Sequence, residues 1–226
     1  MQTSLQKILD KIIYLSFLAL AAITPLIFTT TTTEIYEVPK MYFVYFFATV
    51  LLFATLFKFI LQKKITIPTS GAVNALAIFL IIQAISTIFS TDKFTSIFGY
   101  PTRLNGGLLS LFAYFVIFIS AQINLDRQKA INIILAAFFA SVAVAIWGIP
   151  SYFRYDPSCY VLTGKLTSSC WQKEFNPTLR IFSTLGQPNW LASYLVLTLP
   201  LTLPLLLCAN KQIQKIIIIT SGALIF

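Results

Sequence analysis

The stretch Phe175–Leu195 has the sequence FNPTLRIFSTLGQPNWLASYL and joins a polar segment to a long apolar run. Its first half is rich in turn residues, and the breaker run Gly186–Asn189 follows. The apolar run after it extends to Leu207. Asn189 stands where a helix would begin, and we expect it to be the N-cap residue. The stretch therefore predicts a loop, carrying the isolated Arg180, that leads directly into a membrane helix.

The composition of the whole chain agrees with a membrane protein. Hydrophobic residues make up 58% of the 226 residues and charged residues only 10%, and the 21 Phe outnumber the 16 Lys and Arg. A soluble chain of this length could not bury so much apolar surface. The net charge of +9 comes from cations scattered singly between apolar runs. No basic stripe with interleaved aromatic residues occurs, so we exclude nucleic acid as a partner.

Polar segments divide the chain into apolar runs, and the first six are about one bilayer thick. The seventh stops after 11 residues. We predict an all-α integral membrane protein: a polytopic bundle of six full transmembrane helices and a truncated seventh, forming one domain (1–226) that is a fragment of a larger one. Pro200 and Pro204 predict a kink in the sixth helix. The runs are Ile12–Phe28, Met41–Leu61, Ala72–Phe89, Leu108–Ile123, Ile131–Ile149, Trp190–Leu207 and Ile216–Phe226.

The cations predict the orientation of the chain. With the N-terminus inside, the N-terminal segment and the short inner loops hold nine Lys and Arg, against three in the short outer loops. Because inner loops are enriched in Lys and Arg, we predict that the N-terminus is inside. The long loop 150–188, which contains Lys173, would then be extracytoplasmic.

Three short motifs are similar to one family. The pattern Arg-x-x-Ser-Thr-x-Gly-x-Pro-Asn at Arg180–Asn189 resembles the start of the core segment of the O-antigen ligase and O-antigen polymerase family. Weaker matches are Glu37-Val-Pro-Lys40 and the pair Ser96-Ile-Phe-Gly99 and Arg103-Leu-Asn-Gly-Gly107. The matched segments fall between about Glu37 and Leu207, and the motif residues carried over from the first are Gly186, Pro188 and Asn189.

The resemblance implies a function on the outer face of the bacterial cytoplasmic (inner) membrane. Members of this family are multi-pass enzymes that transfer or polymerise glycan from a polyprenyl-diphosphate carrier. The acceptor is a lipid, a glycan or a protein, and no cofactor is expected. Ligase and polymerase activity are not distinguished by these segments.

Each motif carries one cation that could bind the carrier diphosphate: Lys40, Arg103 or Arg180. Arginine binds phosphate as a planar fork and lysine as a point charge. Gly106 and Gly107 would let the backbone approach a ligand closely. The alternative is that all three cations contact lipid headgroups as interfacial anchors.

The sequence does not supply the rest of a catalytic site. The chain has no His, the commonest general base, and its outer carboxylates, Asp156 among them, have no diagnostic spacing. The resemblance places the catalytic residues on a later outer loop, so we expect them downstream of Phe226 and the chain alone to be inactive. Without His or a Cys-x-x-Cys motif, no metal site is expected.

Cys159 and Cys170 lie 11 residues apart on the expected oxidising side. They could close a hairpin around a turn at Thr163-Gly164 as a disulfide. Two reduced thiols are the alternative.

Two other classes of function stay open. A transporter or flippase for lipid-linked sugars would have ionisable residues or broken helices at mid-membrane depth. A non-catalytic membrane scaffold would make the motif similarity accidental.

Overall fold

The computed structural model describes residues 4–32, 34–65, 68–171 and 176–226, and within these ranges the chain is helical, with no strand. Phe175, the first residue of the motif stretch, and Lys173 of the long loop lie outside the described residues. The all-α prediction is therefore confirmed for the described part of the chain.

Five of the described helices are long and apolar enough to cross a membrane. By comparison, α5 (Leu108–Asn124) has 17 residues and α10 (Gln212–Ile225) has 14. At about 1.5 Å per residue, α5 is roughly 26 Å long, against about 30 Å of hydrocarbon. The sixth full span and the inside N-terminus stay predictions. The five are α1 with the 3₁₀ turn η1 (Ser4–Ile23, Thr24–Leu26), α2 (Glu37–Gln62), α3 (Gly71–Ile88), α6 (Arg127–Tyr152), and α8, η4 and α9 together (Pro188–Thr198, Leu199–Leu201, Thr202–Cys208).

Large apolar side chains on these helices are exposed. In α3 the one buried residue is Val73, and Phe46, Ile78 and Leu197 are 61%, 58% and 74% exposed. Exposure of so much apolar surface is unfavourable in water, whereas contact of the same surface with lipid tails is not. The outer surfaces of these helices therefore suit a bilayer.

Some element boundaries differ from those the sequence predicts. Helix α1 already includes Ser4, the first described residue, because no Gly or Pro interrupts the charged stretch before Ile12. Helix α6 continues past Ile149 through Pro150 to Tyr152, so the loop that follows begins at Phe153. Pro150 is tolerated there because it removes only one hydrogen bond, in the last turn. Within the expected loop before α5, Asp92 caps a short helix, α4 (Lys93–Phe98), by accepting from the Thr95 N–H at 3.1 Å.

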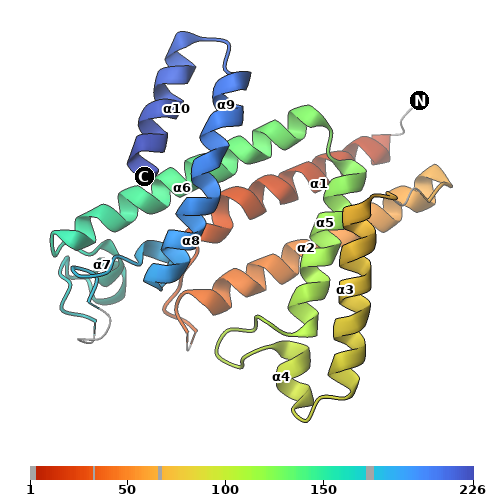
Figure 1. The fold of residues 1–226 in the computed structure, drawn as a ribbon, viewed down its shortest axis with the longest axis horizontal. Helices are drawn as coiled ribbons and strands as arrows, with labels where there is room; N and C mark the ends of the chain where they lie inside the picture. The colour runs from red at the N-terminus through yellow and green to blue at the C-terminus, as the bar shows by residue number, and fades with distance from the viewer. Residues whose placement is uncertain (1–3, 33, 66–67, 172–175) are drawn as a thin grey trace. The chain divides into compact units, whose positions relative to one another are not determined.

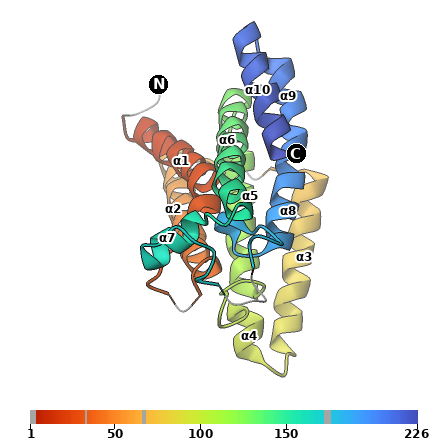
Figure 2. The same cartoon turned by 90° about the vertical axis from the view of Figure 1, so that its left-hand side faces the viewer.

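The chain forms two compact units. The first comprises residues up to Leu20 and Val38–Ala130, and so contains most of α1 and α2 to α5. Within it α3 and α5 run side by side, and α4 lies at one end of both (Figures 1 and 2).

The second unit comprises Ala21–Glu37 and Ile131–Phe226. Helices α9 and α10 form a hairpin in it (Figure 1). A Cβ on Gly222 of α10 would lie only 2.8 Å from Thr202 Cγ2 of α9, so the small residue permits this close packing. The η4 turn at Pro200 interrupts the helix from Pro188 to Cys208 at the predicted kink.

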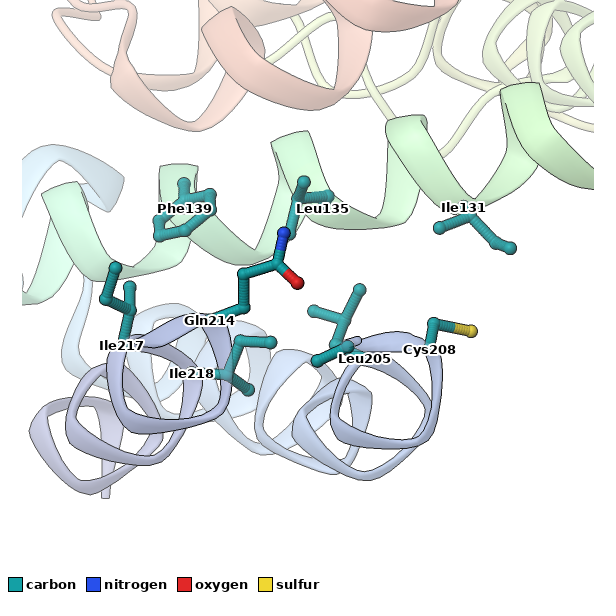
Figure 3. Close-up of a pocket in the computed structure, with 9 residues that line it drawn as sticks. Ile131, Leu135, Phe139, Leu205, Cys208, Gln214, Ile217 and Ile218 are labelled. Atoms are coloured by element: carbon teal, nitrogen blue, oxygen red, sulfur yellow. The ribbon is translucent and has the colours of Figure 1, made fainter. Parts of the chain in front are cut away.

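An apolar pocket of about 200 Å³ lies between α6 and the α9–α10 hairpin. Figure 3 shows Leu135 and Phe139 on α6 opposite Leu205 and Ile218. The Gln214 side chain also faces the pocket, but its Oε1 accepts from the N–H groups of Asn210 and Lys211 and so caps α10. The lining of the pocket is mostly apolar, so the pocket suits a lipid chain or an apolar side chain rather than a polar ligand.

Candidate functional site

The motif turn Arg180–Asn189 lies in the second unit and is fixed there by two buried hydroxyls. Ser183 Oγ donates to the Val144 carbonyl of α6 at 2.6 Å, and Thr184 Oγ1 donates to the Pro25 carbonyl of η1 at 2.8 Å. Both residues are 2% exposed. They belong to the 3₁₀ turn η3 (Ser183–Leu185). The Ser-Thr pair of the motif therefore docks the turn onto α6 and η1.

Gly186 ends η3 in the left-handed region, with φ of 80°. A Cβ at this position would lie 2.5 to 2.7 Å from the Tyr36 side chain. Both the backbone conformation and the close approach of the ring thus require glycine. Tyr36 itself is buried, and burial, with the nearby Asp156 carboxylate, raises the pKa of its phenol.

An aromatic cluster surrounds this contact. The Tyr36 ring lies 5.8 Å from Phe28, 6.1 Å from Phe182 and 6.2 Å from Trp171, between ring centroids. Trp171 and Phe182 meet edge to face at 5.2 Å. Such pairs add to the stability that burial alone provides. The motif turn is consequently a rigid platform within its unit.

Arg180 and Asn189 are the exposed polar residues of this platform. The guanidinium of Arg180 donates to Asn189 Oδ1 at 3.0 Å. The predicted N-cap role of Asn189 is wrong. Helix α8 begins at Pro188 with Gln187 as N-cap, two residues before the predicted cap, because proline fits the first helical position. Asn189 instead orients Arg180 beside the start of α8.

The loop upstream of the motif has a small buried core of its own. The carboxylate of Asp156, 1% exposed, accepts from the Ser158 N–H at 2.8 Å, from Ser151 Oγ at 3.3 Å and from Trp171 Nε1. Asp156 thereby caps the short helix α7 (Pro157–Thr163). The Asp156 carboxylate therefore accepts three hydrogen bonds inside the loop and is buried from solvent.

A disulfide joins Cys159 to Cys170, with their Cα atoms 5.8 Å apart. The flanking structure is not the expected β-hairpin. Cys159 lies on α7, and Gly164 ends that helix in the left-handed region with φ of 73°. The turn at Thr163-Gly164 is thus a helix C-terminus. The Asp156 cap and Pro157 at the first position favour helix over strand here.

In the first unit, the segments that carry Lys40 and Arg103 meet. Tyr45 of α2 donates its hydroxyl to the Leu104 carbonyl at 2.6 Å. The hydroxyl of Tyr114 on α5 contacts Asn105 Oδ1 at 3.0 Å and Met41 Sδ at 3.4 Å. The direct neighbours of the two cations in the sequence are therefore tied together. Arg103 is exposed and Lys40 half-buried at the start of α2.

The two glycines of the Arg103 loop have different surroundings. A Cβ on Gly107 would collide with the backbone of Ile97 and Gly99, so the close approach it permits is to its own chain. Gly106, with φ of 86°, has open space around its Cα. Of the pair expected to admit a ligand, only Gly106 has room for one.

The structure reveals one charged cluster that sequence reasoning missed. Lys58 Nζ lies 2.6 Å from Asp10 Oδ1 and 2.9 Å from Asn124 Oδ1, and Asn124 Nδ2 donates to Thr55 Oγ1 at 3.1 Å. Lys58 of α2 therefore pairs with Asp10 of α1. The only sequence signal for this cluster was that Asp10 lies just before the first apolar run and Lys58 lies near the end of the second. The cluster joins α1, α2 and α5 within the first unit.

Within the described ranges, no three Cys, Asp or Glu residues come together in a way that could hold a metal ion. No protein-family model matches the chain, and neither curated proteins nor solved structures gave a significant match. The helices define the class of protein at a coarse level: an all-α, multi-pass membrane protein.

Proposed function

We propose that this protein is a membrane glycosyltransferase of the O-antigen ligase type. It acts on a polyprenyl-diphosphate-linked glycan at the outer face of the bacterial cytoplasmic membrane and transfers or polymerises that glycan. The N-terminus lies inside, and the loops that carry Arg103 and Arg180 lie outside.

One observation carries the proposal: exposed arginines stand on loops that long-range hydrogen bonds from side-chain hydroxyls hold in place. Arg180 is exposed on the turn that Ser183 and Thr184 anchor. Arg103 is exposed beside the Leu104 carbonyl that Tyr45 holds. An anchor for lipid headgroups gains nothing from a fixed loop, whereas recognition of one diphosphate does. An arginine side chain on a fixed loop loses less conformational entropy on binding phosphate than one on a mobile loop.

The roles of these residues follow from their chemistry. Arg180 is held toward Asn189 at 3.0 Å, so its remaining donors have a defined direction in which to bind a phosphate oxygen. Within the first unit, Lys40 and Arg103 stand on segments that Tyr45 and Tyr114 tie together, and the two cations could bind phosphate there. Neutralising the diphosphate would stabilise it as a leaving group. The residue that takes the proton from the acceptor is not assigned.

The charged cluster of the first unit gives little support to a transporter. Lys58 is four residues from the end of α2, about 6 Å along the axis, and Asp10 is near the start of α1. The pair is therefore close to the membrane surface rather than at mid-membrane depth, where transport sites lie. The position and hydrogen bonds of the Lys58–Asp10 pair suit a structural contact that holds α1, α2 and α5 together.

Glycan transfer by the full-length protein tests the proposal. Membranes that contain it would be supplied with polyprenyl-diphosphate glycan and a range of lipid, glycan and protein acceptors. Arg180→Lys keeps the charge but replaces the fork by a point donor, and we expect at least about tenfold slower transfer. Arg154→Lys, an exposed arginine in the same loop, is the matched control and should transfer normally. Normal transfer by Arg180→Lys and Arg103→Ala at equal expression would leave the cations as headgroup anchors and refute the proposal.

A further inference from the structure

A polar pocket of about 470 Å³ lies in the first unit, at the end of α3 where α4 and the Arg103 loop meet α5. This volume falls within the range of small-molecule sites, about 300–1,000 Å³. Most of its lining is hydroxyl or amide, and none of the lining residues is charged. The polar side chains are Gln83, Ser86, Thr87, Ser90, Thr91 and Ser96.

Some of these side chains are arranged by the protein and others are left for a ligand. Ser90 Oγ contacts Ser96 Oγ at 2.6 Å and donates to the Asp92 carbonyl at 3.1 Å. By contrast, the side chains of Gln83, Ser86 and Thr91 make no hydrogen bond to the described part of the chain. Ser90 and Ser96 therefore shape the pocket, while Gln83, Ser86 and Thr91 offer donors and acceptors to whatever enters it.

The position of Gln83 in α3 indicates why its unbonded amide needs a polar partner. It is five residues from the end of α3, about 8 Å along a helix that is long and apolar enough to span the membrane. A half-buried amide at this depth is costly unless a polar partner satisfies it. Gln83, Ser86 and Thr87 of α3 line one polar cavity together, whereas the fourth polar side chain of this helix, Asn74, does not line it. The helix thus keeps three polar residues where the pocket is.

The chemistry of the lining selects the class of ligand. With no carboxylate the pocket does not suit a cation, and with no Lys or Arg it does not suit phosphate. Hydroxyls and an amide match a neutral molecule with many hydroxyl groups, since each can donate and accept. Phe89, 82% exposed, adds an apolar ring at the edge, against which the C–H face of a sugar can pack.

We propose that this pocket binds a neutral sugar residue of the lipid-linked glycan. The assignment rests on the proposed function for its place in the reaction. Gly106, which lines the pocket, is three residues from Arg103 and has open space at its Cα. A diphosphate bound at Arg103 would therefore have its first sugars within reach of Gln83 and Ser86.

Saturation-transfer NMR on the whole chain in nanodiscs tests the pocket directly, since maltoside detergents would compete. The probes are the methyl glycosides of glucose, galactose, mannose, rhamnose and N-acetylglucosamine. We expect at least one to bind, and Gln83→Leu and Ser86→Ala each to raise its Kd about three- to tenfold, because each removes one or two hydrogen bonds. Gln62→Leu, an exposed glutamine of α2, is the matched control and should leave Kd unchanged.

A second probe, farnesyl diphosphate, separates this inference from the proposed function. If farnesyl diphosphate binds through Arg103 while none of the glycosides binds, the sugar pocket is refuted and the proposed function stands. Binding of glycosides without binding of farnesyl diphosphate supports the pocket and counts against the proposed function. Glycoside binding that Gln83→Leu and Ser86→Ala leave unchanged also refutes the pocket.

Discussion

Gly186 shows how one residue of the motif serves the structure. Its φ of 80° lies in the region that a Cβ disfavours, and the Tyr36 ring occupies the space that a Cβ would need. The first cost arises at any residue in this conformation, about 1–2 kcal/mol. The second arises only where a neighbour is buried and cannot move, as Tyr36 is.

The two costs can be measured apart. Gly164 has a similar φ of 73° and nothing within 4 Å of its Cβ position. Gly164→Ala should therefore lose only the stability that the left-handed backbone conformation costs. We expect Gly186→Ala to lower the stability by about 1–3 kcal/mol more than Gly164→Ala. Thermal unfolding of the purified protein, followed by tryptophan fluorescence, reports the difference. Equal destabilisation by both changes would show that Tyr36 does not restrict residue 186.

Residue roles were the least predictable part of the site. The sequence indicated the turn at Gly186 and a helix starting near Pro188, since both follow from local backbone chemistry. The partners of Ser183 and Thr184 lie 39 and 159 residues away, so no local pattern could reveal them. Asn189 was assigned to the cap because of its type, but its side chain contacts Arg180.

Among the elements, the loop 150–188 departs most from its predicted form. Composition indicated a long polar loop, and part of it is instead helix α7 over a buried carboxylate. The cause is the order Asp156-Pro157, which supplies both the cap and the first residue of a helix. Helix cores, in contrast, followed directly from the apolar runs, because a membrane-length run leaves few other structures possible.

We also predict the redox state of the cysteines. Cys159 and Cys170 should be linked in protein made in an oxidising envelope, and Cys208 should be a free thiol. In the chain-entropy model, closing so short a loop stabilises it by about 2–3 kcal/mol. Mass spectrometry of the non-reduced loop peptide should give a mass two protons lower than the reduced peptide. Replacing both cysteines by serine should destabilise the protein, whereas Cys208→Ser should not.

Two alkylatable thiols at Cys159 and Cys170 in the native protein would contradict the disulfide. The same result would leave α7 held by the Asp156 cap and its bond from Trp171 alone.

For the whole molecule, the open question is its orientation in the membrane. The cation bias predicts that the loop with Lys165 is outside and the turn with Lys211 inside. A reporter cysteine at Lys165 in a cysteine-free background should react with a membrane-impermeant maleimide in intact cells. A reporter at Lys211 should react only after lysis. The opposite pattern would place the cationic loops inside and exclude a carrier on the outer face.

Recognition of a lipid diphosphate is the central property proposed for this protein, and equilibrium binding measures it directly. Native mass spectrometry of the whole chain in nanodiscs would compare undecaprenyl diphosphate with undecaprenyl monophosphate. We expect the diphosphate to bind at least about tenfold more tightly, because its second phosphate offers further oxygens to Arg and Lys donors. Changing Lys40, Arg103 and Arg180 together to Gln should abolish this preference, whereas Arg127→Gln with Lys129→Gln should preserve it. Equal affinity for the two lipids, or a preference that survives loss of Lys40, Arg103 and Arg180, would contradict recognition of a lipid diphosphate by these cations.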